Sequence, residues 1–416
     1  MKKSFLLIFK FLVVFGMVSL SSCHSQTQKN TENVIIDKTK VTWNPSIDDA
    51  LAQAKAQGKV LFVECFSPTC PVCQSMEPFF KNAEVATKYN TDFINYKLDV
   101  GNAEQVKFLN ARNIWLPSFP QFLFFDSDGN LVHQAEPAAE TKSFLNAAEV
   151  AQNPDKRAGN YKKRFDGGER SFDLLVQYAA FCRLTKDTLS NISAANELFK
   201  LYPKNELGTE ASWKITKKCV SDIDNGFAAY WFNHVPQAAS YETKEGHAGG
   251  EYHVLGGIIQ SSLYSPRGKL YDTKKLALVK DYMVKSGAGQ YVDGVTWELE
   301  SLALIREGKA PQSLVIADKM SKKYEGNGQA QVYITSIFNK NYPDKAYVSK
   351  ANAWMAKAKA SIKDEKLMAE YYYESAILNK NAGNISQAKT DATQARNLAS
   401  KYQMDLNKYN NLVGSL

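Results

Sequence analysis

The chain has 416 residues, of which 44% are hydrophobic, 23% charged and 12% aromatic, an ordinary globular composition. This excludes a disordered chain, a collagen-like repeat and a multi-span membrane protein, and the length indicates about two or three domains. Six cysteines are too few for a disulfide-stapled scaffold, so apolar burial must supply the core.

The formal net charge of +8 is divided unevenly along the chain. Residues 41–151 carry 8 Lys and Arg against 13 Asp and Glu, a net charge of −5, whereas residues 152–416 carry 37 against 28, a net charge of +9. An acidic part followed by a basic part bears on docking and partners rather than on fold. Because no basic stripe alternates with aromatic residues, we expect no nucleic-acid partner.

The N-terminus has the pattern of an export signal. Lys2 and Lys3 precede an apolar run over residues 5–20, which is short for a membrane span but typical of a signal peptide over residues 1–22. The sequence Leu-Ser-Ser-Cys that ends at Cys23 resembles a bacterial lipobox. The resemblance implies that Cys23 is lipidated and becomes the new N-terminus; the alternative is an ordinary signal peptide followed by a chance cysteine.

Polar residues dominate the segment 23–40, which we expect to be a tether. The lipobox resemblance implies a lipid anchor on the periplasmic side of the cell envelope. The absence of an acidic residue directly after Cys23 favours the outer membrane over the inner membrane. That compartment is oxidising, so a pair of thiols there has redox significance.

Helix and strand signals alternate over residues 41–151. Helical patterns cover residues 47–57, 70–89, 103–111 and 140–151, and Ser46 and Gly58 bound the first of them. Strand patterns cover residues 59–66, 92–100, 121–125 and 131–134, with a turn signal at 126–129 between the last two. The order α-β-α-β-α-β-β-α predicts an α/β domain.

A Cys-x-x-Cys pair, Cys70 and Cys73, lies between a predicted strand and a predicted helix. With this element order, the pair resembles thioredoxin and the periplasmic C-terminal domain of the thiol:disulfide interchange reductases. Pro78, Glu64 and Phe119-Pro120 also match that pattern. The resemblance implies a thioredoxin-like fold over residues 41–151, a buried acid at Glu64 and a cis-proline at Pro120 that faces the dithiol and holds the substrate backbone.

The placement of the two sulfur atoms predicts their chemistry. Disulfide exchange needs a thiolate, a target disulfide and a resolving thiol. A cysteine at the first turn of a helix faces unpaired N–H groups and the positive end of the helix dipole, which favour its thiolate. We therefore expect Cys70 to be the nucleophile and Cys73 the resolving thiol, with Glu64 accepting the proton of Cys73.

Each of these residues also has a structural interpretation. The cysteine pair could be half of a zinc site, but a second Cys-x-x-Cys and a nearby histidine are missing, or a permanent disulfide, which gains little in so small a loop. Glu64 could be a surface acid at a strand edge.

We expect Cys65 to pack in the core, and Cys182 and Cys219 to pack in helices, with a disulfide between them as the alternative. We expect an exposed His133, and neither a cofactor nor a metal.

The remaining sequence predicts an all-α region after a linker. Residues 152–170 are rich in Gly, Lys and Arg and suggest the linker, and residues 171–416 have helical spacing without strand signals. Two windows resemble tetratricopeptide repeats, through Tyr372, Ala376, Gly383, Ala388, Ala392 and Ala395 and, more weakly, through Trp297, Gly308 and Ala317. Small residues at such positions let paired helices approach closely; a generic helical bundle is the alternative. Residues 235–257 suggest a long glycine-rich loop, in which His247 and His253 lack a defined carboxylate partner for a metal.

Two functions fit these features. The first is a membrane-anchored envelope thiol–disulfide oxidoreductase that reduces protein disulfides and is recharged by an upstream thiol–disulfide electron donor. The dipeptide Pro71-Val72 contains no histidine, and a cation there would favour an oxidant, so we expect a reductase. The second is a binding or scaffold lipoprotein in which the thioredoxin-like fold is only a module and the helical region binds proteins.

Overall fold

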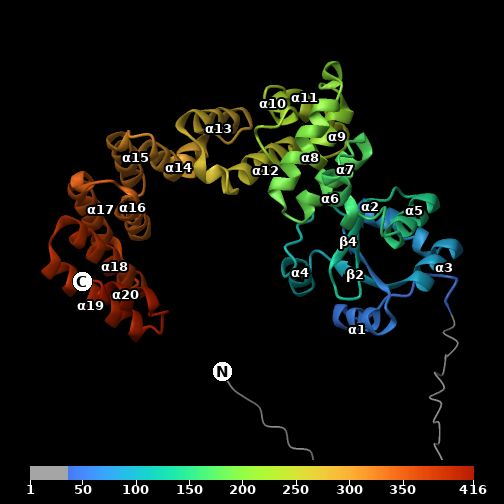
Figure 1. Cartoon of the computed structure of the whole chain (residues 1–416), viewed down its shortest axis with the longest axis horizontal. Helices are drawn as coiled ribbons and strands as arrows, with labels where there is room; N and C mark the ends of the chain where they lie inside the picture. The colour runs from blue at the N-terminus through green and yellow to red at the C-terminus, as the bar shows by residue number, and fades with distance from the viewer. Residues whose placement is uncertain (1–35) are drawn as a thin grey trace, which may run out of the picture.

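The computed structural model describes residues 36–416. It contains a small mixed α/β domain followed by an all-helical region, which confirms the predicted fold class. In Figure 1 the α/β domain lies at one end, and the helices extend away from it as an arc that ends at α20 (Asn407–Gly414). The predicted signal peptide, Cys23 and tether residues 23–35 lie outside the described residues. Within residues 36–416, no helix combines the length and apolar character needed to cross a membrane.

Four strands form the sheet of the α/β domain in the order β2-β1-β3-β4. β1 (Val60–Phe66) is parallel to β2 (Phe93–Asp99) and antiparallel to β3 (Gln121–Phe125), which forms a hairpin with β4 (Leu131–Ala135). The predicted strands are therefore present. The register of β1 and β2 places Glu64 directly opposite Lys97.

Helices cover both faces of this sheet. Leu61, Val63 and Cys65 pack with α1 (Ile47–Gln57) and α4 (Ala103–Asn110). Phe62 packs on the other face with α2 (Pro71–Met76), α3 (Ala83–Asp92) and α5 (Thr141–Gln152). Because side chains alternate along a strand, Glu64 lies on the same face as Phe62, which is the face that α2 covers.

The helix expected over residues 70–89 is divided into three pieces. α2 ends at Met76, the 3₁₀ turn η1 (Phe79–Lys81) follows, and α3 begins at Ala83. Pro78 has no N–H group to donate and its ring clashes with the preceding turn, so the helix cannot continue through it. Asn82 then starts α3, because its side chain accepts hydrogen bonds from the N–H groups of Glu84 and Val85.

The segment predicted as a linker, residues 152–170, is structured and packed. It contains η2 (Ala158–Asn160) and α6 (Tyr161–Asp166), and both Ala158 and Tyr161 are buried in the first core of the helical region. The N–H group of Ala158 donates to Nδ1 of His133 on β4 over 3.2 Å. Two of the glycines that suggested a linker, Gly167 and Gly168, instead end α6.

The helical region is built around two main cores. The first extends from Ala158 to Ala303 and contains the edge-to-face pair Trp213 and Trp231, and the second lies between Trp297 and Leu378. The α-helices are α7 (Phe172–Leu184), α8 (Thr188–Leu201), α9 (Glu210–Cys219), α10 (Gly226–Phe232), α11 (Val235–Lys244), α12 (Gly250–Tyr264), α13 (Thr273–Lys285), α14 (Val292–Arg306), α15 (Ala310–Lys323), α16 (Gly328–Asn341), α17 (Val348–Ser361), α18 (Glu365–Ala382) and α19 (Ile385–Lys401). The loop predicted over residues 235–257 is wrong, because α11 and the start of α12 occupy most of it.

Consecutive helices pack as antiparallel pairs at both windows that resemble tetratricopeptide repeats. α18 and α19 are joined at Gly383, which has φ +93°. Ala376, Ala388 and Ala392 are buried between helices. α14 and α15 are joined in the same way around Gly308. The C-terminal part is therefore all-helical and compatible with a tetratricopeptide-like domain.

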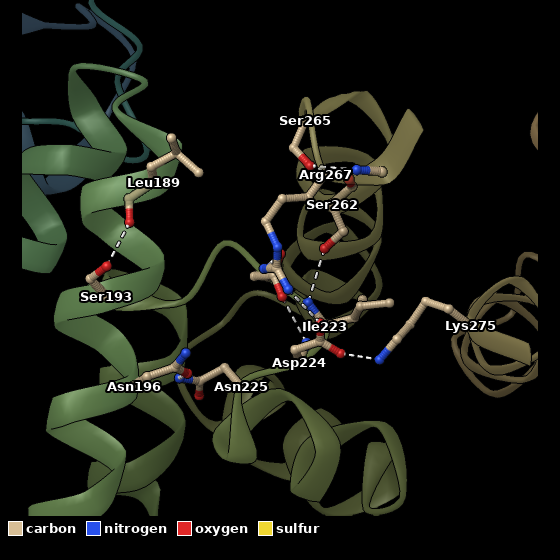
Figure 2. Close-up of polar contacts among 12 residues, drawn as sticks. Leu189, Ser193, Asn196, Ile223, Asp224, Asn225, Ser262, Ser265, Arg267 and Lys275 are labelled. Atoms are coloured by element: carbon tan, nitrogen blue, oxygen red, sulfur yellow. Dashed lines mark hydrogen bonds and ion pairs between the residues drawn. The ribbon is translucent and has the colours of Figure 1, made fainter. Parts of the chain in front are cut away.

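A polar network fixes the short segment between α9 and α10 (Figure 2). The guanidinium of Arg267 lies 3.1 Å from Oδ2 of Asp222 and 2.8 Å from Oδ2 of Asp224, and Lys275 on α13 also pairs with Asp224. The N–H group of Ile223 donates to Oγ of Ser262 on α12 over 2.9 Å. The segment is thus tied to α12 and α13, which holds the helices of the first core together.

The helical region contacts the loop that leads to Pro120. Leu184, the last residue of α7, is fully buried in the core of the α/β domain, and its carbonyl accepts a hydrogen bond from the N–H of Trp115 over 2.8 Å. Nζ of Lys218 on α9 also lies 2.9 Å from Oε2 of Glu136, just after β4. The two parts of the molecule therefore meet beside residues 115–120.

Candidate active site

Cys70 caps the N-terminus of α2, directly after the turn that follows β1. Its Sγ accepts a hydrogen bond from the N–H of Cys73 over 3.3 Å, and Pro71 occupies the first helical position. Cys70 is half-buried, Cys73 is 2% exposed, and both are free thiols. An N–H donor and the positive end of a helix both stabilise negative charge on sulfur. This geometry suits Cys70 to the predicted position of nucleophile.

The buried thiol of Cys73 resists ionisation. Burial raises its pKa to about 12, and the nearby charges of Cys70 and Glu64 act in the same direction. At neutral pH Cys73 therefore stays protonated while Cys70 meets solvent. A buried thiol in this state becomes a nucleophile only when a base takes its proton.

Glu64 is a buried acid with a raised pKa. Its side chain is fully buried, and burial raises its pKa to about 7; Lys97 lowers this value and Glu77 raises it. Nζ of Lys97 lies 3.4 Å from Oε2 of Glu64, but neither carboxyl oxygen has a hydrogen-bond partner within residues 36–416. The interpretation of Glu64 as a surface acid is wrong. A carboxyl group with this pKa exchanges its proton close to neutral pH.

Lys97 is a charged residue of the site that the sequence analysis did not identify. Its ammonium group pairs with Glu77 and lies over the rings of Phe66, at 4.8 Å, and Trp43, at 5.3 Å. A lysine within the apolar strand Phe93–Asp99 was the available signal. Sequence alone did not show that its partner would be the buried Glu64 of the neighbouring strand.

The peptide bond between Phe119 and Pro120 is cis, as the thioredoxin resemblance implies. Pro120 is buried, and the carbonyl oxygen of Phe119 lies 3.9 Å from Sγ of Cys70. Three large apolar side chains in the two segments that carry Cys70 and Pro120 are exposed: Val72 by 54%, and Trp115 and Phe119 by 43% each. A backbone carbonyl thus lies beside the nucleophile, and the neighbouring segments expose apolar side chains that an approaching polypeptide could contact.

The other cysteines of residues 36–416 lie away from this site or behind it. Cys65 is fully buried on the opposite face of β1. Cys182 and Cys219 are free and buried in the first helical core, where burial raises the pKa of each to about 12. They pack as expected, and the alternative of a disulfide between them is not formed.

The histidines differ from the sequence predictions. His133 is 5% exposed, so the expectation that it is exposed is wrong: η2, from the segment taken for a linker, covers it. Burial and the charge of Arg157 lower its pKa to about 4. His247 lies close to the carboxylates of Glu242 and Glu245, which the sequence did not indicate. Both carboxylates already pair with Lys217.

Comparison with known proteins agrees with this geometry. A family model described as thioredoxin-like matches residues 42–127. The matched segment contains Glu64, Cys70, Cys73 and Pro120, so this part of the chain is thioredoxin-like. No curated protein matches the chain.

Proposed function

We propose that the protein is a thiol–disulfide oxidoreductase that acts on protein disulfides through Cys70 and Cys73. The observation that carries the proposal is the position of Cys70: its sulfur meets solvent, accepts the N–H of Cys73 and lies 3.9 Å from the carbonyl of Phe119. Proteins with a thioredoxin-like fold generally have oxidoreductase activity. A pure scaffold would not require a half-exposed thiol paired with a buried one.

The reaction proceeds by two exchanges. The thiolate of Cys70 attacks one sulfur of the substrate disulfide, forms a mixed disulfide and releases the other substrate sulfur as a thiolate, which takes a proton from water. Cys73 then attacks Sγ of Cys70 while its proton passes to Glu64. The second substrate thiol leaves, and a Cys70–Cys73 disulfide remains. Two electrons have moved from the dithiol to the substrate, and a thiol–disulfide electron donor restores the dithiol by the reverse exchange.

The direction proposed is reduction. The dipeptide Pro71-Val72 supplies no cation beside Cys70. A cation there would stabilise the thiolate, and a strongly stabilised reduced form makes a disulfide an oxidant. Equilibration with glutathione buffers tests this direction. The Cys70–Cys73 disulfide of a reductase should persist in buffers that reduce the disulfide of a strong oxidant.

The proposed location is the cell envelope, with the chain attached by lipid on Cys23 and facing the periplasm, at the outer membrane rather than the inner. The support is the lipobox-like sequence that ends at Cys23. Metabolic labelling with a fatty acid tests it. Label should enter the natural chain and be lost in Cys23→Ser; equal labelling of both would contradict the anchor.

Trapping of mixed disulfides tests the activity itself. Cys73→Ser removes the resolving thiol, so Cys70 should capture protein partners in complexes that a reducing agent releases. Cys65→Ser and Cys182→Ser change buried thiols outside the pair and serve as matched controls that should capture none. If Cys73→Ser captures no partner and reduced protein does not reduce insulin, the proposal is wrong.

The second candidate is a binding or scaffold lipoprotein. It is favoured by the size of the helical region, where paired helices from α14 to α19 form stacked surfaces. Partner capture separates the two functions. A scaffold would retain its partners in the double variant Cys70→Ser/Cys73→Ser, whereas an oxidoreductase would lose those held through sulfur.

A further inference from the structure

A groove lies where the α/β domain meets the helical region, directly beside the active site. It has a volume of about 470 Å³, and its walls are the loop 115–118, the end of β4 and helices α7, α9 and α12. Ser118 lines the groove, and the next residue, Phe119, carries the carbonyl that lies 3.9 Å from Sγ of Cys70. One end of the groove therefore lies a single residue along the chain from the carbonyl that faces Cys70.

Basic residues outnumber acidic ones along this groove. Arg183, Lys214, Lys217 and Lys218 line it against Glu136 and Glu245, a net charge of +2. The three lysines of the groove are paired: Lys218 with Glu136, and Lys214 and Lys217 with Glu210, Glu242 and Glu245, a cluster that Lys244 also joins. Four lysines thus balance four glutamates, and the positive charge that is left is that of Arg183.

Arg183 is held in place without a carboxylate. Its guanidinium donates to the carbonyl oxygen of Lys217 and lies 5.3 Å from the ring centre of Trp115. Within residues 36–416, it forms no ion pair with a carboxylate at 4.0 Å or less. Arg183 is partly buried, and this burial lowers its pKa, so its charge is less well hydrated than one on an open surface. A carboxylate that enters the groove would restore the missing interaction, and a guanidinium binds carboxylates in a planar, two-pronged geometry.

We propose that the groove binds the segment of the substrate protein next to its disulfide, and that Arg183 pairs with an Asp or Glu side chain in that segment. This inference rests on the proposed function and names its substrate class. Consecutive Cα atoms lie about 3.8 Å apart, so the loop from Trp115 to Phe119 spans at most about 15 Å. An extended peptide advances about 3.4 Å per residue, which places the acidic residue within about five residues of the reacting cysteine.

A peptide series tests the proposal with the unaltered full chain. Three disulfide-linked peptides share one sequence and differ only in Glu, Gln or Lys at the third position from the cysteine. Reduced protein is mixed with each, and the rate of peptide reduction is followed by mass spectrometry. We expect the Glu peptide to be reduced about tenfold faster than the Gln peptide, the Lys peptide more slowly still, and the preference to decrease with added salt.

Two variants test whether Arg183 causes the preference for the Glu peptide. Arg183→Gln should bring the Glu-to-Gln rate ratio close to one. Lys389→Gln removes an exposed charge on α19, which lies at the opposite end of the arc from α7 and α9 (Figure 1), and should leave the ratio unchanged. Since the peptide comparison uses the natural chain, it tests the preference for an acidic residue even if Arg183→Gln does not fold.

The outcomes separate this inference from the proposed function. Reduction of all three peptides at equal rates leaves the oxidoreductase in place and overturns the acidic-segment inference. A preference for Glu that survives Arg183→Gln in folded protein overturns the assignment to this groove. Reduction of none of the peptides contradicts the proposed function and this inference together.

Discussion

Replacing Glu64 by Gln should make the protein more stable and less active. The pKa of Glu64 rises from 4.5 to about 7 on folding, and a shift of this size corresponds to about 3 kcal/mol. The sign follows from proton binding. Below pH 4.5 the group is protonated in both states, and between pH 4.5 and 7 the unfolded chain releases the proton first, so stability falls as pH rises. Above pH 7 the full penalty of burying the carboxylate is present.

Urea unfolding of the reduced protein at pH 5 and pH 8 measures this effect. We expect Glu64→Gln to raise the free energy of unfolding by up to about 3 kcal/mol at pH 8 and by much less at pH 5. Glu84→Gln, an exposed acid on α3, is the control and should change little at either pH. An equal effect of Glu64→Gln at both pH values would refute the argument from burial.

The same variant should slow the second exchange. Without the Glu64 carboxylate, the proton of Cys73 has no acceptor beside it, and loss of a general base slows such a step by about 100-fold. The lifetime of the mixed disulfide, followed after rapid mixing and acid quench at pH 7, reports this rate. An unchanged lifetime would remove Glu64 from the mechanism, whatever its effect on stability.

Three further predictions follow from the same contacts. Glu77→Gln frees Lys97 to pair with Glu64, so the pKa of Glu64 falls and the pH profile of the second exchange moves to lower pH; a shift to higher pH would contradict this. His133 has a pKa of about 4 in the folded protein against 6.5 unfolded, so about 3 kcal/mol of stability should be lost as pH falls from 6.5 to 4. His133→Gln should remove that dependence in urea unfolding at pH 4.5 and 7. Leu184→Ala leaves a cavity where α7 enters the α/β domain and should lower stability by about 2–5 kcal/mol; a change below about 1 kcal/mol would show that this contact is weak.

The sequence was most informative where local patterns and chemistry agree. The strands were found because residues such as those of β1 and β3 form apolar runs bounded by turn signals. Cys70 and Cys73 were identified because a Cys-x-x-Cys between a strand and a helix resembles the thioredoxin pattern, and Cys70 was assigned as the nucleophile because a helix start favours a thiolate. The cis bond before Pro120 came from the thioredoxin resemblance alone.

What the sequence did not reveal depends on contacts between distant segments. Lys97 is part of the site only because β2 lies beside β1, and His133 is buried only because η2 folds over β4. The composition of residues 152–170 suggested a linker because Gly and Lys are more frequent there than apolar residues. Only the structure shows that Ala158 and Tyr161 anchor the segment in a core. The groove beside Arg183 is lined by residues that lie between about 115 and 254 in the sequence. No local sequence pattern indicates that these residues come together.

The most direct test of the central claim is a redox titration of the purified chain in glutathione buffers, with each cysteine assigned by mass spectrometry. We predict one reversible two-electron couple that joins Cys70 to Cys73, while Cys65, Cys182 and Cys219 remain thiols because they are buried. A pair that never forms this disulfide, or forms it and is not reduced again, would contradict the account.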